Sequence, residues 1–118
     1  MIASSLVLTG CGSVKTPGYP GICTAIAVSS LNVTVRDTAT GAPVCDAGVI
    51  AIHDGVDLYS LRQTGDCRYA GPEERSGIFE VVATRSGYRA VRVTGVRVSR
   101  DECHVIPVAV TVDMHPGS

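Results

Sequence analysis

The chain has 118 residues, which is enough for one domain, and its ten basic and eleven acidic residues give a formal net charge of −1. This balance argues against nucleic-acid binding, which needs a basic face, and no polybasic patch is present for anionic lipid. With no Trp and one Phe, the core has to be built from aliphatic residues, so a fold of this size would gain from covalent cross-links.

An apolar run at the N-terminus ends at a cysteine. The sequence "LTGC", which ends at Cys11, resembles the lipobox of bacterial lipoproteins. The resemblance implies that residues 1–10 are a signal peptide that is removed. Cys11 would then carry palmitate or similar acyl chains that anchor the protein to a membrane. Gly12 and Ser13 follow the cysteine, where lipoproteins kept in the inner membrane carry Asp. This implies delivery to the outer membrane of a bacterial cell envelope.

Residues 1–10 contain no Lys or Arg, although a secretory leader opens with positive charge. We therefore expect the true leader to begin upstream of Met1. The alternative is that residues 2–8 form an edge strand and that Cys11 is a free, buried thiol. Residues 12–22 contain three Gly and two Pro and no periodicity, which predicts a tether of at most ~35 Å.

From Cys23 onward the apolar residues follow a period of two, which is typical of strands with one buried face. No stretch shows a convincing helical period. Six or seven short strands separated by turns predict an all-β fold, an antiparallel β-sandwich over residues 23–114 with a tail at 115–118. The expected strands are 31–36, 49–53 ("VIAIH"), 58–63 ("LYSLRQ"), 79–84, 91–98 and 106–113.

Glycine and proline mark the turns between these strands. Gly41 in "TGAP" supplies a positive φ, and "RSGY" at 85–88 is a hairpin turn. Gly95 shifts the alternation by one residue, which predicts a β-bulge. Pro107 cannot donate to a ladder, so that end of the last strand should lie at an edge or a bulge. Residues 65–77 hold three glycines and a proline, which predicts a long polar loop without regular structure.

Two stretches, "VTVRDTATGAPVCDAGVIAIHDG" and "GIFEVVATRSGYRAVRVTGVRV", resemble the carboxypeptidase regulatory-like domain over roughly residues 31–113. The resemblance implies a transthyretin-like, or prealbumin-like, sandwich of about seven strands that is usually not catalytic, so we expect no enzyme and no cofactor. The four cysteines of the body and the sequence "CRYAGPEERSG" depart from the family pattern. The residues that match it are Asp37, Thr40, Gly41, Pro43, Val44, Asp54, Gly55, Gly77, Phe79, Gly87 and Tyr88.

The chain contains five cysteines, and the four that follow Cys11 allow three pairings. Cys45 precedes "VIAIH" and Cys67 follows "LYSLRQ", so the open end of that hairpin predicts a Cys45–Cys67 disulfide. In the transthyretin-like fold the first and last strands run parallel in one sheet. The resemblance therefore implies a second disulfide, because Cys23 precedes the first strand and Cys103 precedes the last. The alternative is a zinc site formed by Cys67, Cys103 and His104.

Candidate functional residues are few. A ligand site, if present, is expected in the 65–77 loop, at Arg68, Tyr69, Glu73, Glu74 and Arg75.

His53 lies beside Asp54 and Asp57, and these residues could bind a divalent ion, although a polar turn explains them as well. Hydroxyisourate hydrolases share the transthyretin-like fold but end in Y-R-G-S, whereas this chain ends in "MHPGS". Their activity is therefore not expected here.

The leading hypothesis is a lipid-anchored envelope protein with one non-catalytic sandwich that binds an envelope protein or a glycan, or has a structural role. One alternative is a minor exported enzyme or hydrolase accessory that uses the 65–77 loop with His53, Asp54 and Glu74. The other is a metal-binding lipoprotein.

Overall fold

A computed structural model describes residues 23–117, so the signal peptide, the lipidated Cys11 and the tether predicted for residues 1–22 lie outside the described residues. Residues 23–117 contain no helix, and therefore none that could span a membrane. The strands are β1 (Ser29–Asp37), β2 (Gly48–His53), β3 (Asp57–Ser60), β4 (Arg62–Gln63), β5 (Arg68–Glu73), β6 (Gly77–Thr84), β7 (Val91–Val98) and β8 (Val108–Met114).

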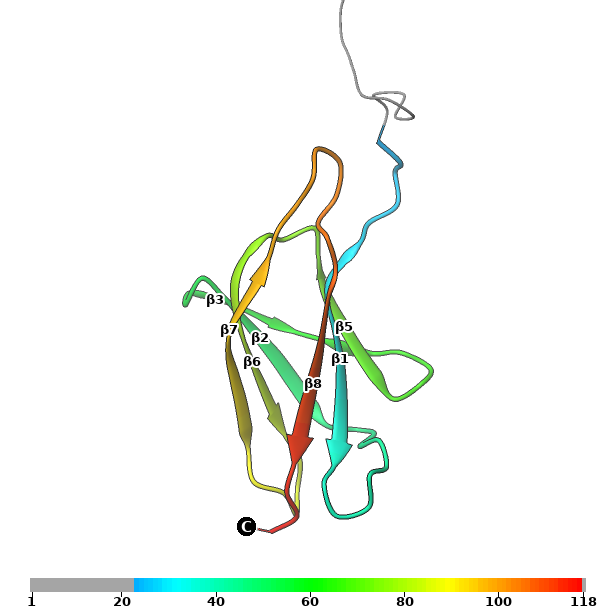
Figure 1. Ribbon diagram of the computed structural model, residues 1–118, viewed down its shortest axis with the longest axis vertical. Helices are drawn as coiled ribbons and strands as arrows, with labels where there is room; N and C mark the ends of the chain where they lie inside the picture. Colours follow the sequence, from blue (N-terminus) through cyan, green and yellow to red (C-terminus); the bar gives the residue numbers. More distant parts are fainter. Residues whose placement is uncertain (1–22, 118) are drawn as a thin grey trace, which may run out of the picture.

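The strands form two sheets, ordered β4-β5-β1-β8 and β3-β2-β6-β7, that pack face to face (Figure 1). Every pairing is antiparallel except that of β1 with β8, which run parallel in register from Leu31–Val108 to Asp37–Met114. The expected all-β sandwich is confirmed, with eight strands rather than about seven. The parallel pairing of the first and last strands is the feature that the family resemblance implied.

The alternating residues of the central strands build the core. Strands β1, β6 and β8 send alternate side chains inward. Each fully buried aliphatic or aromatic side chain stabilises the fold by roughly 1.5–3 kcal/mol. The single Phe, Phe79, is completely buried in this core. The other core residues with no exposed surface are Leu31, Val33, Val35, Ala51, Val81, Ala83, Val112 and Met114.

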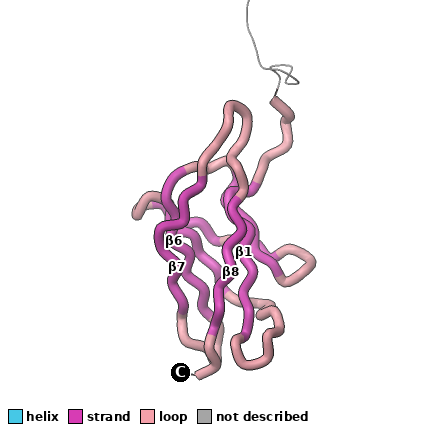
Figure 2. Tube along the Cα trace, viewed as in Figure 1, coloured by secondary structure: helices cyan, strands magenta, loops and turns pink. Residues whose placement is uncertain are grey.

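The sandwich has two ends with different connections (Figure 2). The described chain begins at one end, which we call the tether end and define by residues 23–28, 74–77 and 99–107. Strands β1 and β8 both run from there to the far end, which we define by residues 38–47, 85–90 and 115–117.

Two motif residues close the far end. The Tyr88 hydroxyl donates to Asp37 Oδ2 at 2.6 Å, and Asp37 Oδ1 accepts the backbone N–H groups of Ala39 and Thr40. The Tyr88 hydrogen bond, followed by these N–H groups, lowers the pKa of Asp37, and Asp37 in turn raises the pKa of Tyr88. Gly41 completes the turn with φ of 77°, as predicted.

A second pair of motif residues, Asp54 and Gly77, meets where β2 ends and β6 begins. Asp54 Oδ1 accepts the backbone N–H of Ile78 at 2.9 Å. Gly77 has φ of 138°, and a Cβ there would lie 2.7 Å from both Asp54 Oδ1 and His53 Nε2. The motif glycine and aspartate therefore have a structural explanation, because only glycine fits at this approach.

The bulge predicted at Gly95 is present. Phe79 pairs with Val96 and Val81 pairs with Val93, so β7 has one residue more than β6 between these pairs. Gly95 takes φ of 70° within the bulge.

Two predictions about the middle of the chain are wrong. The expected strand 58–63 divides at Leu61, whose buried side chain marks the crossing from β3 in one sheet to β4 in the other. Residues 65–77 are not an irregular loop, because Arg68–Glu73 forms β5 along β1. Pro72 is tolerated there because β4 pairs only with Tyr69 and Ala70, so the proline lies beyond the part of β5 that is paired on both sides.

Candidate functional site

The five residues predicted to form a binding loop point to different places. Tyr69 is buried, and its hydroxyl donates to Val44 O and accepts from Ala47 N, so it belongs to the core. Glu73 pairs with Arg62 at 2.5 Å, and that hydrogen bond lowers the pKa of Glu73.

The remaining three residues also lie in three different places. Arg75 Nε donates to the Tyr59 hydroxyl. Glu74 turns into the tether end, whereas Arg68 lines a cavity at the opposite end of β5.

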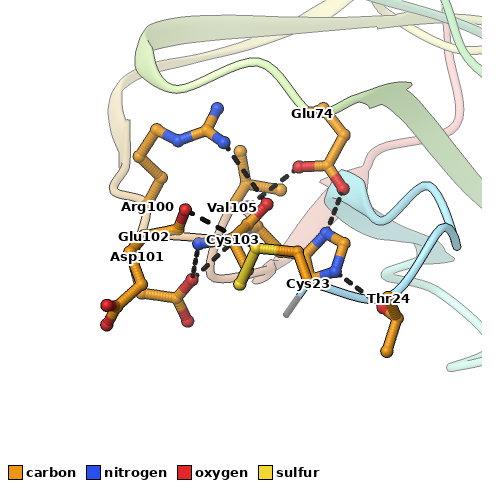
Figure 3. Close-up of a disulfide and its surroundings, with 9 residues drawn as sticks. Cys23, Thr24, Glu74, Arg100, Asp101, Glu102, Cys103 and Val105 are labelled. Atoms are coloured by element: carbon orange, nitrogen blue, oxygen red, sulfur yellow. Dashed lines mark hydrogen bonds and ion pairs between the residues drawn. A yellow bond between two sulfur atoms is a disulfide. The ribbon is translucent and has the colours of Figure 1, made fainter. Parts of the chain in front are cut away.

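A polar cluster at the tether end surrounds the Cys23–Cys103 disulfide (Figure 3). The structure joins Cys23 to Cys103 and Cys45 to Cys67, with Cα–Cα distances of 5.2 and 4.8 Å. These are the two predicted pairs, and the structure supports both. Cys67 and Cys103 belong to different disulfides, so they are not joint ligands of the alternative zinc site.

The disulfide brings two polar neighbours together. Thr24 follows Cys23 and His104 follows Cys103 in the sequence, and the Thr24 hydroxyl lies 2.8 Å from His104 Nε2. On the other side of the ring, His104 Nδ1 lies 2.6 Å from Glu74 Oε2. The three side chains therefore form a hydroxyl–imidazole–carboxylate array, with one ring nitrogen facing each partner.

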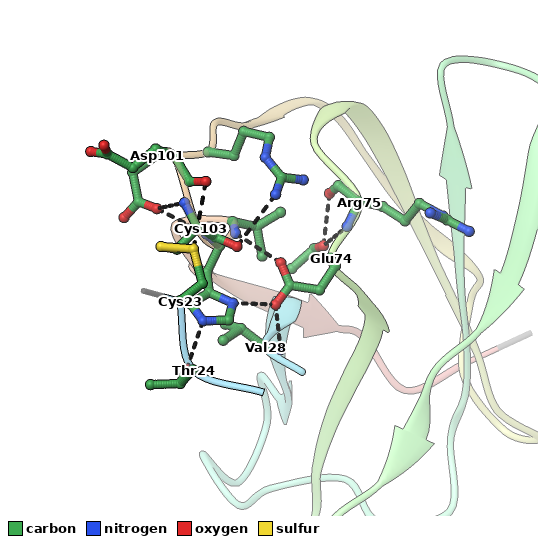
Figure 4. Close-up of polar contacts among 12 residues, drawn as sticks. Cys23, Thr24, Val28, Glu74, Arg75, Asp101 and Cys103 are labelled. Atoms are coloured by element: carbon green, nitrogen blue, oxygen red, sulfur yellow. Dashed lines mark hydrogen bonds and ion pairs between the residues drawn. A yellow bond between two sulfur atoms is a disulfide. The ribbon is translucent and has the colours of Figure 1, made fainter. Parts of the chain in front are cut away.

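Glu74 is held in place by the backbone (Figure 4). Its Oε2 accepts the N–H of Val28 at 2.9 Å and its Oε1 accepts the N–H of Val105 at 3.1 Å. The hydrogen bond from His104 lowers the pKa of Glu74, and the two backbone N–H groups lower it further. Glu74 is therefore ionised at neutral pH and bonded to the other two segments of the tether end, 23–28 and 99–107.

The protonation of His104 follows from its partners. An ionised carboxylate only accepts hydrogen bonds, so His104 Nδ1 carries the proton that Glu74 accepts. The other nitrogen of a neutral ring is then an acceptor. When the ring is neutral, the Thr24 hydroxyl therefore donates to Nε2.

The loop before β8 holds His104 through its backbone. Asp101 Oδ1 accepts the N–H groups of Cys103 and His104, each at 2.8 Å. The His104 N–H, followed by that of Cys103, lowers the pKa of Asp101. A charged, hydrogen-bonded turn therefore presents the imidazole ring.

A second threonine–histidine contact lies at the far end. The Thr38 hydroxyl is 3.0 Å from His115 Nδ1 and donates to Met114 O at 3.3 Å. Because a hydroxyl has one proton, Thr38 accepts from His115 rather than donating to it. Within residues 23–117, no carboxylate bonds to the other nitrogen of His115.

His53 is held separately from this cluster. Its Nε2 donates to Ser76 O at 2.7 Å, and this contact is the main cause of its raised pKa. Asp54 and Asp57 lie 3.5 Å from opposite nitrogens of the ring, so they do not converge on one point. Among residues 23–117, no group of three His, Cys, Asp or Glu side chains could hold a metal ion.

The predicted grouping of His53, Asp54 and Glu74 is wrong. Glu74 lies on His104 instead. The reason is that Glu74 follows β5 in one sheet, whereas His53 ends β2 in the other.

Arg68 lines a cavity of about 310 Å³ with Thr34, Arg36, Gly41, Pro43 and Asp66. Arg36 pairs with Asp113 at 3.1 Å, and Arg68 makes no ion pair within residues 23–117. A second cavity, of about 460 Å³, lies over the outer side of the other sheet beside Ile52 and Ile78. The arginine-lined cavity is the one with charges suited to an anionic ligand.

The fold and these contacts define a disulfide-linked β-sandwich with a polar cluster at one end. No family model matches the chain, and no curated protein matches its sequence. The resemblance to the carboxypeptidase regulatory-like domain therefore stays a prediction. Among solved structures, the chain is similar to 5-hydroxyisourate hydrolase from Klebsiella pneumoniae, with 18% identity and a TM-score of 0.47. The match covers 77% of this chain and 93% of that one.

This similarity corrects one expectation. We expected no enzyme because the family resemblance implied a module that is usually not catalytic, yet the similar structure is that of a hydrolase. The non-catalytic expectation is therefore withdrawn. At this level of identity and overlap, the similarity assigns no activity to this chain.

Sequence reasoning missed the role of Thr24 and the partner of His104. A usable signal was present, because each of these residues directly follows a cysteine of the predicted Cys23–Cys103 pair. The participation of Glu74 had no such signal, since it depends on how β5 ends beside β1.

Proposed function

We propose that the chain is a lipid-anchored protein of a bacterial cell envelope, carried by the outer membrane, in which the sandwich is a binding domain. Cys11 carries the lipid, and residues 12–22 connect it to the domain. The "LTGC" sequence before a Gly- and Pro-rich segment supports the anchor. Two disulfides support export, because such bonds persist in oxidising compartments.

The position of the arginine-lined cavity is the observation that supports a binding role. Described residues begin at the tether end, and the cavity is lined by the second half of β1 and by Gly41 and Pro43 of the far end. An anchored domain would therefore present this cavity away from its lipid. Arg36 in its lining is already paired with Asp113. The guanidinium of Arg68, which makes no ion pair among the described residues, suits a carboxylate-bearing partner, such as an acidic glycan or an acidic segment of another envelope protein.

The anchor is tested by cell fractionation of Cys11→Ser, with Ser13→Ala as the matched control. Wild type and Ser13→Ala are expected in the membrane fraction, and Cys11→Ser in the soluble fraction, because only the cysteine can form the thioether. A Cys11→Ser protein that stays with the membrane contradicts the anchor.

The binding role is tested with oligogalacturonate, an acidic oligosaccharide, and with a neutral glucose oligomer. Arg68→Ala should weaken saturable binding of the acidic probe at least about tenfold, since a charged hydrogen bond contributes roughly 1.5–3 kcal/mol. Arg97→Ala, an exposed position on β7, is the control and should bind as wild type does. Equal binding of the acidic and neutral probes contradicts an anion-selective cavity.

A further inference from the structure

The array at the tether end has the order of groups that activates a hydroxyl. A hydroxyl becomes a nucleophile when an adjacent base takes its proton and a third group orients that base. Here the Thr24 hydroxyl lies 2.8 Å from His104 Nε2, to which it donates when the ring is neutral, and His104 Nδ1 donates to Glu74 at 2.6 Å. Both distances lie within the reach required for proton transfer.

The support around the array fixes its geometry. The Cys23–Cys103 disulfide covalently joins the residues that precede Thr24 and His104. Glu74 is bonded to backbone on both sides, at Val28 and Val105. The imidazole therefore has little freedom to turn away, which is a requirement for general-base catalysis.

The hydroxyl is open to a reactant. Thr24 is exposed, whereas the His104 ring and the Glu74 carboxylate behind it are partly covered. Neither the cavity beside Arg36 nor the cavity beside Ile52 is lined by Thr24. An acyl donor would thus approach an open surface, which suits a small acyl group and gives no pocket for a large one.

We propose that Thr24 is an acyl-acceptor nucleophile, with His104 as its general base and Glu74 as the positioning residue, and that it reacts with small activated carboxylic esters. The Thr24 oxygen forms a bond to the ester carbonyl carbon while His104 Nε2 takes the hydroxyl proton. The bond from that carbon to the leaving oxygen then breaks, and the imidazolium returns the proton to the departing alcohol. The products are acyl-Thr24 and the free alcohol, with no oxidant or further reactant needed.

The far end provides an internal control. Thr38 also touches a histidine ring, but it accepts from that ring and donates to Met114 O. Its proton is thus not directed at a base. Thr38 should react no faster than an ordinary hydroxyl, although both threonines belong to the same molecule.

The experiment treats the full chain with p-nitrophenyl acetate and maps acetylated residues by peptide mass spectrometry over time. The chain carries Cys11→Ser, which removes the one cysteine outside the two disulfides. Thr24 is expected to be acetylated about 100-fold faster than Thr38, because only Thr24 has a general base. His104→Gln should slow Thr24 about 100-fold, the lower end of the general-base contribution, and leave Thr38 unchanged.

Glu74→Gln keeps the shape of the side chain and removes its charge. It should slow Thr24 about tenfold while the Thr38 rate stays constant, a selective loss that general loosening of the fold would not produce. His115→Gln is the matched histidine control and should leave Thr24 unaffected. Acetylation of Thr24 at the rate of Thr38, or an unchanged Thr24 rate in a folded His104→Gln protein, overturns the proposal. The anchor plays no part in this test, so the outcome is independent of the proposed envelope location.

Discussion

Each end of the sandwich places a threonine hydroxyl against a histidine ring, but the two contacts run in opposite directions. At the tether end Thr24 donates to the neutral ring of His104, because Glu74 holds the ring proton on the far nitrogen. At the far end Thr38 donates to a backbone carbonyl and accepts from His115. The comparison teaches that the third partner, rather than the threonine–histidine pair, decides whether a hydroxyl is directed at a base.

The two ends also differ in how their disulfides constrain the chain. Cys23–Cys103 spans 80 residues and Cys45–Cys67 spans 22. In the chain-entropy model, removing them by paired Cys→Ser substitution lowers the free energy of unfolding by about 4.5 and about 3.5 kcal/mol, as upper values. Urea unfolding of the two double variants measures both. A loss under about 1 kcal/mol from either pair would contradict the stabilising role of that bond.

Glycine gives a second comparison of the ends. Gly41 and Gly77 both have positive φ, but a Cβ at Gly41 meets open space, whereas one at Gly77 meets Asp54 and His53 at 2.7 Å. Gly41→Ala should therefore lower the free energy of unfolding by about 1 kcal/mol. Gly77→Ala should cost more than about 2 kcal/mol, because a steric clash adds to the backbone strain. Thermal denaturation ranks the two, and equal losses would show that the contact at Gly77 relaxes freely.

The pH dependence of the tether end gives the smallest expected effect. The pKa of Glu74 is lowered in the folded protein, so its contribution is fully present above the pKa of the unfolded chain, about 4.3. That contribution is lost as the pH falls through the lower pKa of the folded state. The stability difference between wild type and Glu74→Gln that comes from this carboxylate should therefore be fully present above about pH 4.3 and shrink as the pH falls below that value.

Urea unfolding at a series of pH values measures this difference. Tyr59→Phe removes an exposed hydroxyl that binds Arg75 and serves as the control, with no such change expected. A difference that grows on acidification would mean that protonated Glu74 is the better-bonded form.

The strand pattern was predictable because alternation is a local property. Val33, Val35 and Val81 follow the period of two and are buried as expected. The β5 strand was not predictable in this way, since Gly71 and Pro72 are turn formers in any local context. Only pairing with β1 makes that segment a strand.

The candidate site was predictable only in part. The Cys45–Cys67 pair followed from the hairpin, and the family resemblance implied that Cys23 and Cys103 meet. The contact of Glu74 with His104 could not, because the two lie 30 residues apart on segments whose approach depends on the end of β5. A sequence pattern alone does not show whether the motif residues Asp37 and Tyr88 are structural or functional. In the structure the Tyr88 hydroxyl donates to Asp37, so the two residues have a structural role.

The most direct test of the contrast between the ends is the ring protonation of His104, measured by nitrogen-15 NMR at neutral pH in the full chain. The expected spectrum shows the proton on Nδ1 and an unprotonated Nε2 that accepts from Thr24. It should also show a change in the Nε2 signal when Thr24→Val removes the donor. A proton on Nε2 instead would mean that the ring donates to the hydroxyl, and the tether end would then be no different from the far end.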